Sequence, residues 1–185
     1  MSISHWNIDH TWTLFLDRDG VINERKFGGY ITKVDEFQFL PQVKEAIASL
    51  SKVFNLVIVV TNQQGIAKGI MTERNVLEIH TYMCDQIQIA GGRIDKCYFA
   101  PNKKGAEDDM RKPTPVMAKL AKIHYPEIEF SRCIMVGDTD TDIEFGRNLG
   151  MKTVRIKTEE PIALKADLTV NGLDELAKLI EHEVS

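Results

Sequence analysis

Short apolar runs alternate with helical patterns along this chain, and this alternation constrains the fold more than any other feature. Strands are expected at 13–16, 56–60, 94–100, 133–136, 152–156 and 168–170. Helices are expected between them, at 41–52, 72–90, 113–124, 139–148 and 173–182. This order predicts an α/β fold with a doubly wound, mostly parallel sheet and helices on both faces.

Capping and turn residues suggest where several of these helices begin and end. Pro41 and Pro113 suit the first position of a helix, where a missing N–H costs nothing. Thr72 is a suitable N-cap for the long central helix. The pair Gly91-Gly92 is a typical helix stop.

The chain has 185 residues, which predicts a single domain over 1–185 with a polar N-terminal extension at 1–11. The extension lacks the apolar core of a signal peptide, and the aliphatic run 56–60 is too short to span a membrane. We therefore expect a cytoplasmic protein without a membrane partner. The three cysteines, Cys84, Cys97 and Cys133, form no CxxC motif and are expected as buried, reduced thiols.

Two carboxylates follow the first expected strand, in the stretch Asp17-Arg18-Asp19-Gly20. Residues two apart in an extended chain point to the same side, so Asp17 and Asp19 should lie together. Neighbouring carboxylates repel each other unless they share a proton or a cation, and Mg²⁺ fits oxygen ligands best. With a metal, one carboxylate can act as a nucleophile while the other transfers protons. An ordinary polar turn is the alternative interpretation.

Polar residues also follow the second expected strand and precede a later helix. The stretch 61–65 reads Thr-Asn-Gln-Gln-Gly, and its hydroxyl, amides and backbone N–H groups suit an anionic oxygen. Arg111 and Lys112 place two cations where a phosphate could bind. Taken singly, the first stretch could be an ordinary turn and the basic pair a solvated one.

Three acids follow the fourth expected strand: Asp138, Asp140 and Asp142. Asp138 lies at the strand's end and Asp142 one helical turn later. A helix N-terminus favours negative charge, and this alone could explain Asp140. Sites in open α/β sheets lie beyond the carboxyl ends of the strands, so these acids should join the other polar groups there. Together they are the parts that phosphoryl transfer requires.

The same residues, in the same order, resemble the haloacid dehalogenase (HAD) superfamily. The matching features are the DxDG of Asp17, the strand-end Thr61, Lys112 before a helix and GDxxxD at 137–142, and the resemblance covers about 14–156. Within the superfamily, DRDGVIN, VVTNQQGIAKG and RKP are similar to the branch of D-glycero-D-manno-heptose 1,7-bisphosphate and histidinol-phosphate phosphatases. No long insertion interrupts the motifs, which implies a HAD-like Rossmannoid fold without a large cap domain.

The resemblance implies a Mg²⁺-dependent phosphatase with a phospho-aspartyl intermediate. Asp17 would be the nucleophile and a metal ligand. Asp19 would be the general acid and then the base, and would give the metal its backbone carbonyl. Thr61 would bind the phosphoryl group, and Lys112 would neutralise it and orient Asp17. Asp138 would be the second carboxylate ligand of Mg²⁺.

The resemblance also implies residues around these groups. Substrate contacts would come from Arg111, Asn62, Gln63, Gly29 and Tyr30. Asp142 would lie behind the metal ligands as a supporting acid. Relatives of this branch often carry a zinc site built from a CxH and a later CxC before RKP. Here these stretches read Ala-Pro-Asn at 100–102 and Asp-Asp-Met-Arg at 108–111, so no zinc is expected.

The leading hypothesis is therefore a phosphomonoesterase acting on a small phosphorylated metabolite, with heptose 1,7-bisphosphate as the first candidate. Histidinol phosphate is the second candidate and a polynucleotide 3′-phosphate the third. The net charge of −4 and the absence of a basic, aromatic surface argue against nucleic acid as the partner. A phosphotransferase and a non-catalytic sugar-phosphate-binding protein are the rivals from other classes. The sequence leaves open whether an oligomer covers the open site.

Overall fold

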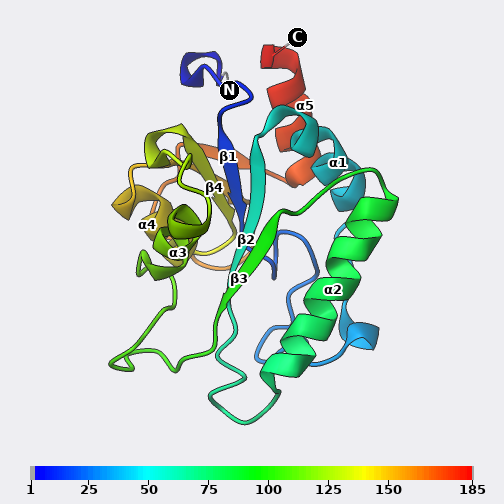
Figure 1. Ribbon diagram of the computed structural model, residues 1–185, viewed down its shortest axis with the longest axis vertical. Helices are drawn as coiled ribbons and strands as arrows, with labels where there is room; N and C mark the ends of the chain where they lie inside the picture. The colour runs from blue at the N-terminus through cyan, green and yellow to red at the C-terminus, as the bar shows by residue number, and fades with distance from the viewer. Residues whose placement is uncertain (1–2, 185) are drawn as a thin grey trace.

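The computed structural model describes residues 3–184, and its centre is a six-stranded parallel sheet (Figure 1). The strands are β1 (Thr13–Leu16), β2 (Leu56–Asn62), β3 (Lys96–Ala100), β4 (Cys133–Gly137), β5 (Lys152–Ile156) and β6 (Leu168–Val170). They lie in the order β3-β2-β1-β4-β5-β6, and every neighbouring pair is parallel. The predicted α/β fold is confirmed. The direction of winding changes between β1 and β4, which is where open sheets of this kind form a crevice.

Five α-helices cover the two faces of the sheet (Figure 1). The helices α1 (Val43–Val53), α2 (Glu73–Ile89) and α5 (Leu173–Val184) lie on one face. The helices α3 (Val116–His124) and α4 (Asp140–Asn148) lie on the other. Three short 3₁₀ turns complete the described elements: η1 (Ser4–Trp6), η2 (Val34–Glu36) and η3 (Phe130–Arg132). The doubly wound arrangement is the one that the strand–helix alternation predicts.

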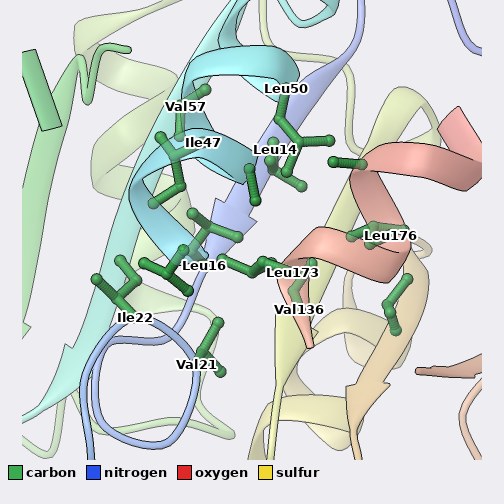
Figure 2. Packing of buried hydrophobic residues seen from close by; sticks show 14 of the residues in the cluster. Leu14, Leu16, Val21, Ile22, Ile47, Leu50, Val57, Val136, Leu173 and Leu176 are labelled. Atoms are coloured by element: carbon green, nitrogen blue, oxygen red, sulfur yellow. The ribbon is translucent and has the colours of Figure 1, made fainter. Parts of the chain in front are cut away.

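Strand β1 contributes to both hydrophobic layers because its side chains alternate between the two faces. Leu14 and Leu16 belong to the larger core cluster, where they lie close to Leu50 of α1 and Leu173 of α5 (Figure 2). Phe15 points the other way and belongs to the second cluster, which α3 and α4 cover. All three β1 side chains are fully buried. The strand is therefore a rigid support for the residues that follow it.

Two predicted helix starts are wrong. Helix α1 begins at Val43, not Pro41, because Gln42 has a left-handed backbone with a φ of 59° that cannot continue a helix. Helix α3 begins at Val116, not Pro113. The chain first makes a turn in which the N–H of Thr114 donates to the carbonyl of Arg111 at 2.8 Å. The Lys112–Pro113 bond within this turn is cis.

The boundaries of the long helix α2 agree with the sequence. The Thr72 hydroxyl caps the helix by accepting from the N–H of Asn75 at 3.2 Å, and the Asn75 side chain accepts from the Thr72 N–H at 2.9 Å. The helix ends before Gly91, which adopts a φ of 83° that favours glycine. This capping box fixes the start of α2 close to the loop that follows β2.

The first two residues of the predicted N-terminal extension lie outside the described residues. In the remainder of the extension, Ile3 and Trp6 are buried in the larger core cluster. The described residues begin and end at the end of the sheet opposite to the loops that follow the strands (Figure 1). Within 3–184, no helix is long and apolar enough to cross a membrane.

Candidate active site

Asp17 lies directly after β1, at the crevice between β1 and β4. Its N–H donates to the carbonyl of Val136 at 2.9 Å, which extends the sheet pairing by one residue and fixes the backbone. The chain then turns at Gly20, whose φ is 89°. A Cβ at Gly20 would lie 2.3 Å from Oδ2 of Asp138, so any larger residue would collide with that carboxylate. The DxDG turn thus brings the ends of β1 and β4 together.

Lys112 is the cation of the site, although it is remote in sequence from both acids that it contacts. Its Nζ lies 2.8 Å from Oδ1 of Asp17 and 2.6 Å from Oδ1 of Asp142. The residue is only 3% exposed. Burial alone would lower the pKa of Lys112, but the two carboxylates outweigh it and raise this pKa above its ordinary value. Lys112 is therefore charged.

Asn62 holds Lys112 in place through the backbone. Its Oδ1 accepts from the Lys112 N–H at 2.9 Å, and its Nδ2 donates to the Lys112 carbonyl at 3.2 Å. Both polar atoms of the Asn62 side chain are thus engaged. Asn62 also lines the pocket, as expected, but its observed contacts connect the end of β2 to the catalytic cation.

Asp142 has two functions in the structure. Besides its ion pair with Lys112, its Oδ2 accepts from the N–H of Thr139 at 3.0 Å and completes the capping box that starts α4. A Cβ at Gly137 would lie 2.1 Å from that of Asp142, so the close approach requires glycine. Asp142 therefore contacts both Lys112 and the start of α4.

Three buried carboxylates converge beside Lys112. Oxygen atoms of Asp17, Asp138 and Asp142 all lie within 4.8 Å of one another. Burial, and then repulsion from the neighbouring acids, raises the pKa of Asp17 to about 7 even though Lys112 opposes the change. Burial and Asp142 likewise raise the pKa of Asp138 to about 6, against the opposing charge of Arg25. Such a cluster is costly without a cation.

The cluster fits a hard divalent cation. Oδ1 of Asp138 is buried and has no hydrogen-bond partner among the described residues, so it is free to act as a ligand. All donors in the cluster are carboxylate oxygens, the type that Mg²⁺ prefers.

The carboxylate of Asp19 is not part of this cluster, although Asp19 lines the same pocket as Asp17. Nη2 of Arg18 contacts both carboxylate oxygens of Asp19 at 2.9 Å. Nδ2 of Asn23 and Nε2 of Gln63 each donate to Asp19 at 2.9 Å. Burial would raise the pKa of Asp19, but these donors, led by the Arg18 charge, hold it below its ordinary value.

The buried residues Arg18 and Gln63 form the support behind Asp19. Gln63 also donates to the Thr61 hydroxyl at 2.9 Å. It is only 1% exposed, so our prediction that it lines the pocket is wrong, and Gln64 lines it instead. Nη1 of Arg18 lies 3.4 Å from Nε2 of His80, and burial together with the Arg18 charge lowers the pKa of His80 to about 3.

A pocket of about 400 Å³ opens above these groups. The predicted residues Asp17, Asp19, Thr61, Arg111, Lys112 and Asp138 line it, together with Gly29 and Tyr30. Two further cations line the pocket, although no motif indicated them. Nη1 of Arg25 lies 3.1 Å from Asp138 and 3.2 Å from Glu160. Nζ of Lys68 lies 5.4 Å from the centre of the Tyr30 ring. Both residues lie in the long loops after β1 and β2. Their positive charge is the feature of the sequence that could have indicated a contact with an anionic substrate.

Asp140 points away from the pocket, in agreement with its interpretation as a helix-start residue. Its carboxylate accepts from the N–H groups of Ala163 and Leu164 at 2.8 Å and 3.2 Å. The fully buried Arg155 donates to Asp140 at 2.6 Å, and to the carbonyls of Asp138 and Leu164 at 2.9 Å. This guanidinium therefore connects β5, the start of α4 and the loop that follows β5, directly behind the site.

Comparison with known proteins agrees with this geometry. The model of the HAD-hydrolase-like family matches residues 109–175. A D-glycero-alpha-D-manno-heptose-1,7-bisphosphate 7-phosphatase of Mycobacterium tuberculosis is 35% identical over 140 residues, or 76% of this chain and 74% of that protein. A D-glycero-beta-D-manno-heptose-1,7-bisphosphate 7-phosphatase of Photorhabdus laumondii is 33% identical over 181 residues, or 91% of this chain and 94% of that protein.

Solved structures agree as well. The D,D-heptose 1,7-bisphosphate phosphatase of Burkholderia thailandensis has a TM-score of 0.67 at 26% identity, covering 92% of this chain and 98% of that one. The B. bronchiseptica enzyme, solved with magnesium and phosphate, has a TM-score of 0.84 at 24% identity, covering 93% and 99%, and supports the fold.

The fold and the carboxylates at its strand ends define a phosphoric monoester hydrolase of the HAD class. Within that class, the chain belongs to the family of the D-glycero-D-manno-heptose-1,7-bisphosphate 7-phosphatases. The resemblance identified from its motifs is therefore confirmed.

Proposed function

We propose that this phosphatase hydrolyses the 7-phosphate of D-glycero-D-manno-heptose 1,7-bisphosphate through a phospho-aspartyl intermediate on Asp17. The observation that carries the proposal is the contact of Asp17 with the buried cation Lys112 at 2.8 Å on the floor of the pocket. The substrate is proposed from the relatives, which are D-glycero-D-manno-heptose-1,7-bisphosphate 7-phosphatases. The rest of the pocket supplies the other groups that the reaction needs.

Magnesium is the proposed cofactor. The carboxylates of Asp17 and Asp138 and the backbone carbonyl of Asp19 would hold it, and the unpartnered Oδ1 of Asp138 supports this assignment. Bound Mg²⁺ would supply positive charge that offsets the phosphate oxygens. Asp142 would act through Lys112, which it holds by the ion pair at 2.6 Å. This division of labour accounts for all three acids of the cluster.

In the first proposed step, an Asp17 oxygen attacks phosphorus and the bond to the sugar oxygen breaks. Asp19 protonates that oxygen as it leaves. Asp19 is ionised in the substrate-free structure, so it must first gain a proton, which an incoming phosphate anion favours by raising its pKa. Lys112 and the Thr61 hydroxyl would stabilise the transferring group.

In the second proposed step, water attacks the phospho-aspartate on Asp17. Asp19, now a carboxylate, accepts the proton from this water. The bond between phosphorus and Asp17 breaks, which releases inorganic phosphate and regenerates the free carboxylate. The network that holds Asp19 in its charged form suits this step directly.

The substrate is proposed to contact the upper part of the pocket through Arg111, Gly29 and Tyr30, which line it. For Asn62 and Gln63 the observed hydrogen bonds favour a positioning function, through Lys112 and Asp19 respectively. We further propose that residues 1–185 form one phosphatase domain, with 1–11 as an extension that packs on it. The burial of Ile3 and Trp6 supports this division.

We also propose that the loop 101–110 works without zinc. Asn102 Oδ1 accepts from the N–H of Met110 at 3.4 Å, which links the two ends of the loop. Both carboxylate oxygens of Asp109 accept backbone N–H groups, from Gly105 and Arg111, at 2.9 Å. Hydrogen bonds thus take the part that a metal would play. Metal analysis of the purified protein should find no stoichiometric zinc, and a full equivalent would refute this proposal.

The deciding experiment is phosphate release with Mg²⁺ and with EDTA. The panel holds both anomers of heptose 1,7-bisphosphate, histidinol phosphate, other sugar phosphates and a 3′-phosphorylated oligonucleotide. We expect strong, Mg²⁺-dependent release from a heptose bisphosphate and none from the Asp17→Asn variant, which controls for contaminating phosphatases. Preference for another member of the panel would overturn the proposed identity of the substrate. Transfer of phosphate to an acceptor without release would overturn hydrolysis.

A further inference from the structure

Two of the three cysteines face each other, at a place that the proposed reaction does not use. Cys84 lies in α2 and Cys97 in β3, and their Sγ atoms are 3.9 Å apart. Both residues are half-buried, so a small oxidant can reach them. Cys133 in β4 is fully buried and its thiol donates to the carbonyl of Glu129 at 3.1 Å. The chain therefore holds one close thiol pair and one isolated thiol.

The packing of α2 against β3 keeps the two thiols opposite each other. His80 lies one helical turn before Cys84, and Phe99 lies two residues after Cys97 on the same side of the strand. The rings of His80 and Phe99 make an edge-to-face contact with their centres 6.0 Å apart. The thiol contact thus continues a row of contacts between α2 and β3. The packing of the two elements therefore holds the sulfur atoms near each other.

The short separation makes a covalent bond accessible. An S–S bond is about 2 Å long, so the sulfur atoms must approach by roughly a further 2 Å, which side-chain rotation and a small shift of the helix can provide. Strand β3 is at the edge of the sheet, where fewer neighbours resist such a shift. The cysteines lie in consecutive elements, so the bond would tie α2 to the next strand, β3.

The two sulfurs also differ in chemical character. The hydrogen bond between the two thiols lowers the pKa of Cys84, which favours its thiolate, while the same bond and burial raise the pKa of Cys97. Burial raises the pKa of Cys133 to about 12. Because the thiolate is the nucleophile, the pair contains an attacking sulfur and a second sulfur that can follow it, whereas Cys133 is inert.

We propose that Cys84 and Cys97 form a peroxide-sensitive thiol pair that closes to a disulfide between α2 and β3. The Cys84 thiolate attacks one oxygen of hydrogen peroxide, the O–O bond breaks, and a sulfenic acid and hydroxide result; the hydroxide takes up the proton that the Cys84 thiol had released and becomes water. The Cys97 sulfur then attacks the sulfenic sulfur, and the S–S bond forms as the hydroxyl leaves with the Cys97 proton as water. The two thiols are oxidised by two electrons and the peroxide is reduced to two molecules of water. A thiol reductant reverses the bond.

Peptide mapping tests the bond directly. The full-length protein is treated with millimolar hydrogen peroxide, alkylated, and digested with trypsin, which cleaves after Arg74, Arg93, Lys96 and Lys103. We expect one new species in which the peptide 75–93 is joined to 97–103, and its loss after dithiothreitol. Free thiols should fall from three to one per chain. Separate peptides carrying sulfinic or sulfonic acids, or a bond between two chains, would overturn the proposal.

Matched variants and a thermal shift keep the test independent of the proposed function. Cys133→Ser should still form the linked peptide, whereas Cys84→Ser and Cys97→Ser should not. Oxidation should raise the Tm of the wild-type protein by about 5 °C or more, because the bond restricts the unfolded chain. The Cys84→Ser protein should show no rise. A linked peptide in the Cys84→Ser protein, or an unchanged Tm in the oxidised wild type, would refute the assignment.

Discussion

The floor of the pocket and the loop 101–110 both lie at the carboxyl ends of the strands, yet they are held by different interactions. The floor consists of buried charges: Asp17, Asp138 and Asp142 around Lys112. The loop is largely exposed, and the side chains of Asn102 and Asp109 hold it through hydrogen bonds to its own backbone.

The two regions therefore serve different purposes: the floor carries out the reaction, and the loop shapes the surroundings of the pocket. Each charge on the floor depends on the others, because removing one leaves its partner largely buried without its opposite charge. A bond in the loop can be lost and replaced by water at small cost. We therefore expect substitutions on the floor to be severe and coupled, and substitutions in the loop to be mild and independent.

Asp17→Asn should abolish turnover, with a loss of at least about 10⁴-fold, because an amide cannot attack phosphorus. The neutral side chain also relieves repulsion within the cluster, so the metal-free protein should remain folded. Phosphate release and circular dichroism test the two parts. Near-native activity in this variant would show that another residue is the nucleophile.

Lys112→Ala should lower the rate by about 10³-fold, because it removes the cation from the transferring group. It should also destabilise the metal-free protein by about 3 kcal/mol, since Asp17 and Asp142 lose their buried partner. Kinetics and urea unfolding measure these effects, and Mg²⁺ should recover part of the stability. If the variant were as stable as the wild type without metal, the account of coupled charges would fail.

The effect of Mg²⁺ on thermal stability should depend on pH. The pKa values of Asp17 and Asp138 are raised to about 7 and about 6, so both hold protons at pH 5.5 and compete with metal. Raised carboxyl pKa values cost the metal-free fold stability as the pH rises toward 7, and bound Mg²⁺ then compensates. We expect a clearly larger Mg²⁺-induced rise in Tm at pH 8 than at pH 5.5. Equal shifts at the two pH values would contradict the raised pKa values.

Asp109→Ala should have the smallest effect. It removes two acceptors from the loop, and the freed N–H groups can bind water, so the loss of stability should be about 1 kcal/mol or less. The turnover number should change by less than about threefold because no contact to Lys112 or Asp17 is lost. A loss as large as that of Lys112→Ala would show that the loop and the floor are one unit.

The sequence predicted most of the fold because strand and helix periodicities dominate in a buried sheet. It failed at Pro41 and Pro113, where residues suited to a helix start stand in turns instead. Proline fixes its own φ but says little about the residues that follow it. At Pro113, the tight turn brings the Lys112 backbone to Asn62, a tertiary requirement that local propensity does not contain.

The site was predictable where each group ends its own strand, as with Asp17, Thr61 and Asp138. It was not predictable where function depends on the direction of a side chain. Gln63 and Gln64 are identical in type and adjacent, yet one supports Asp19 from below and the other lines the pocket. Arg25 was missed because its partners, Asp138 and Glu160, are more than a hundred residues away. Such pairings arise only from the folded topology.

The buried guanidinium of Arg155 also has a consequence for how this chain can diverge. It serves a carboxylate at 140 and carbonyls at 138 and 164. Loss of Asp140 alone would strand a buried cation, so mutations at 140 and 155 should spread through descendants together or not at all. The loop after β5 must still present a carbonyl at 164, and its Glu160 must still pair with Arg25. A chimera that exchanges this loop must therefore keep Asp140 and Arg155 together with a carbonyl at 164.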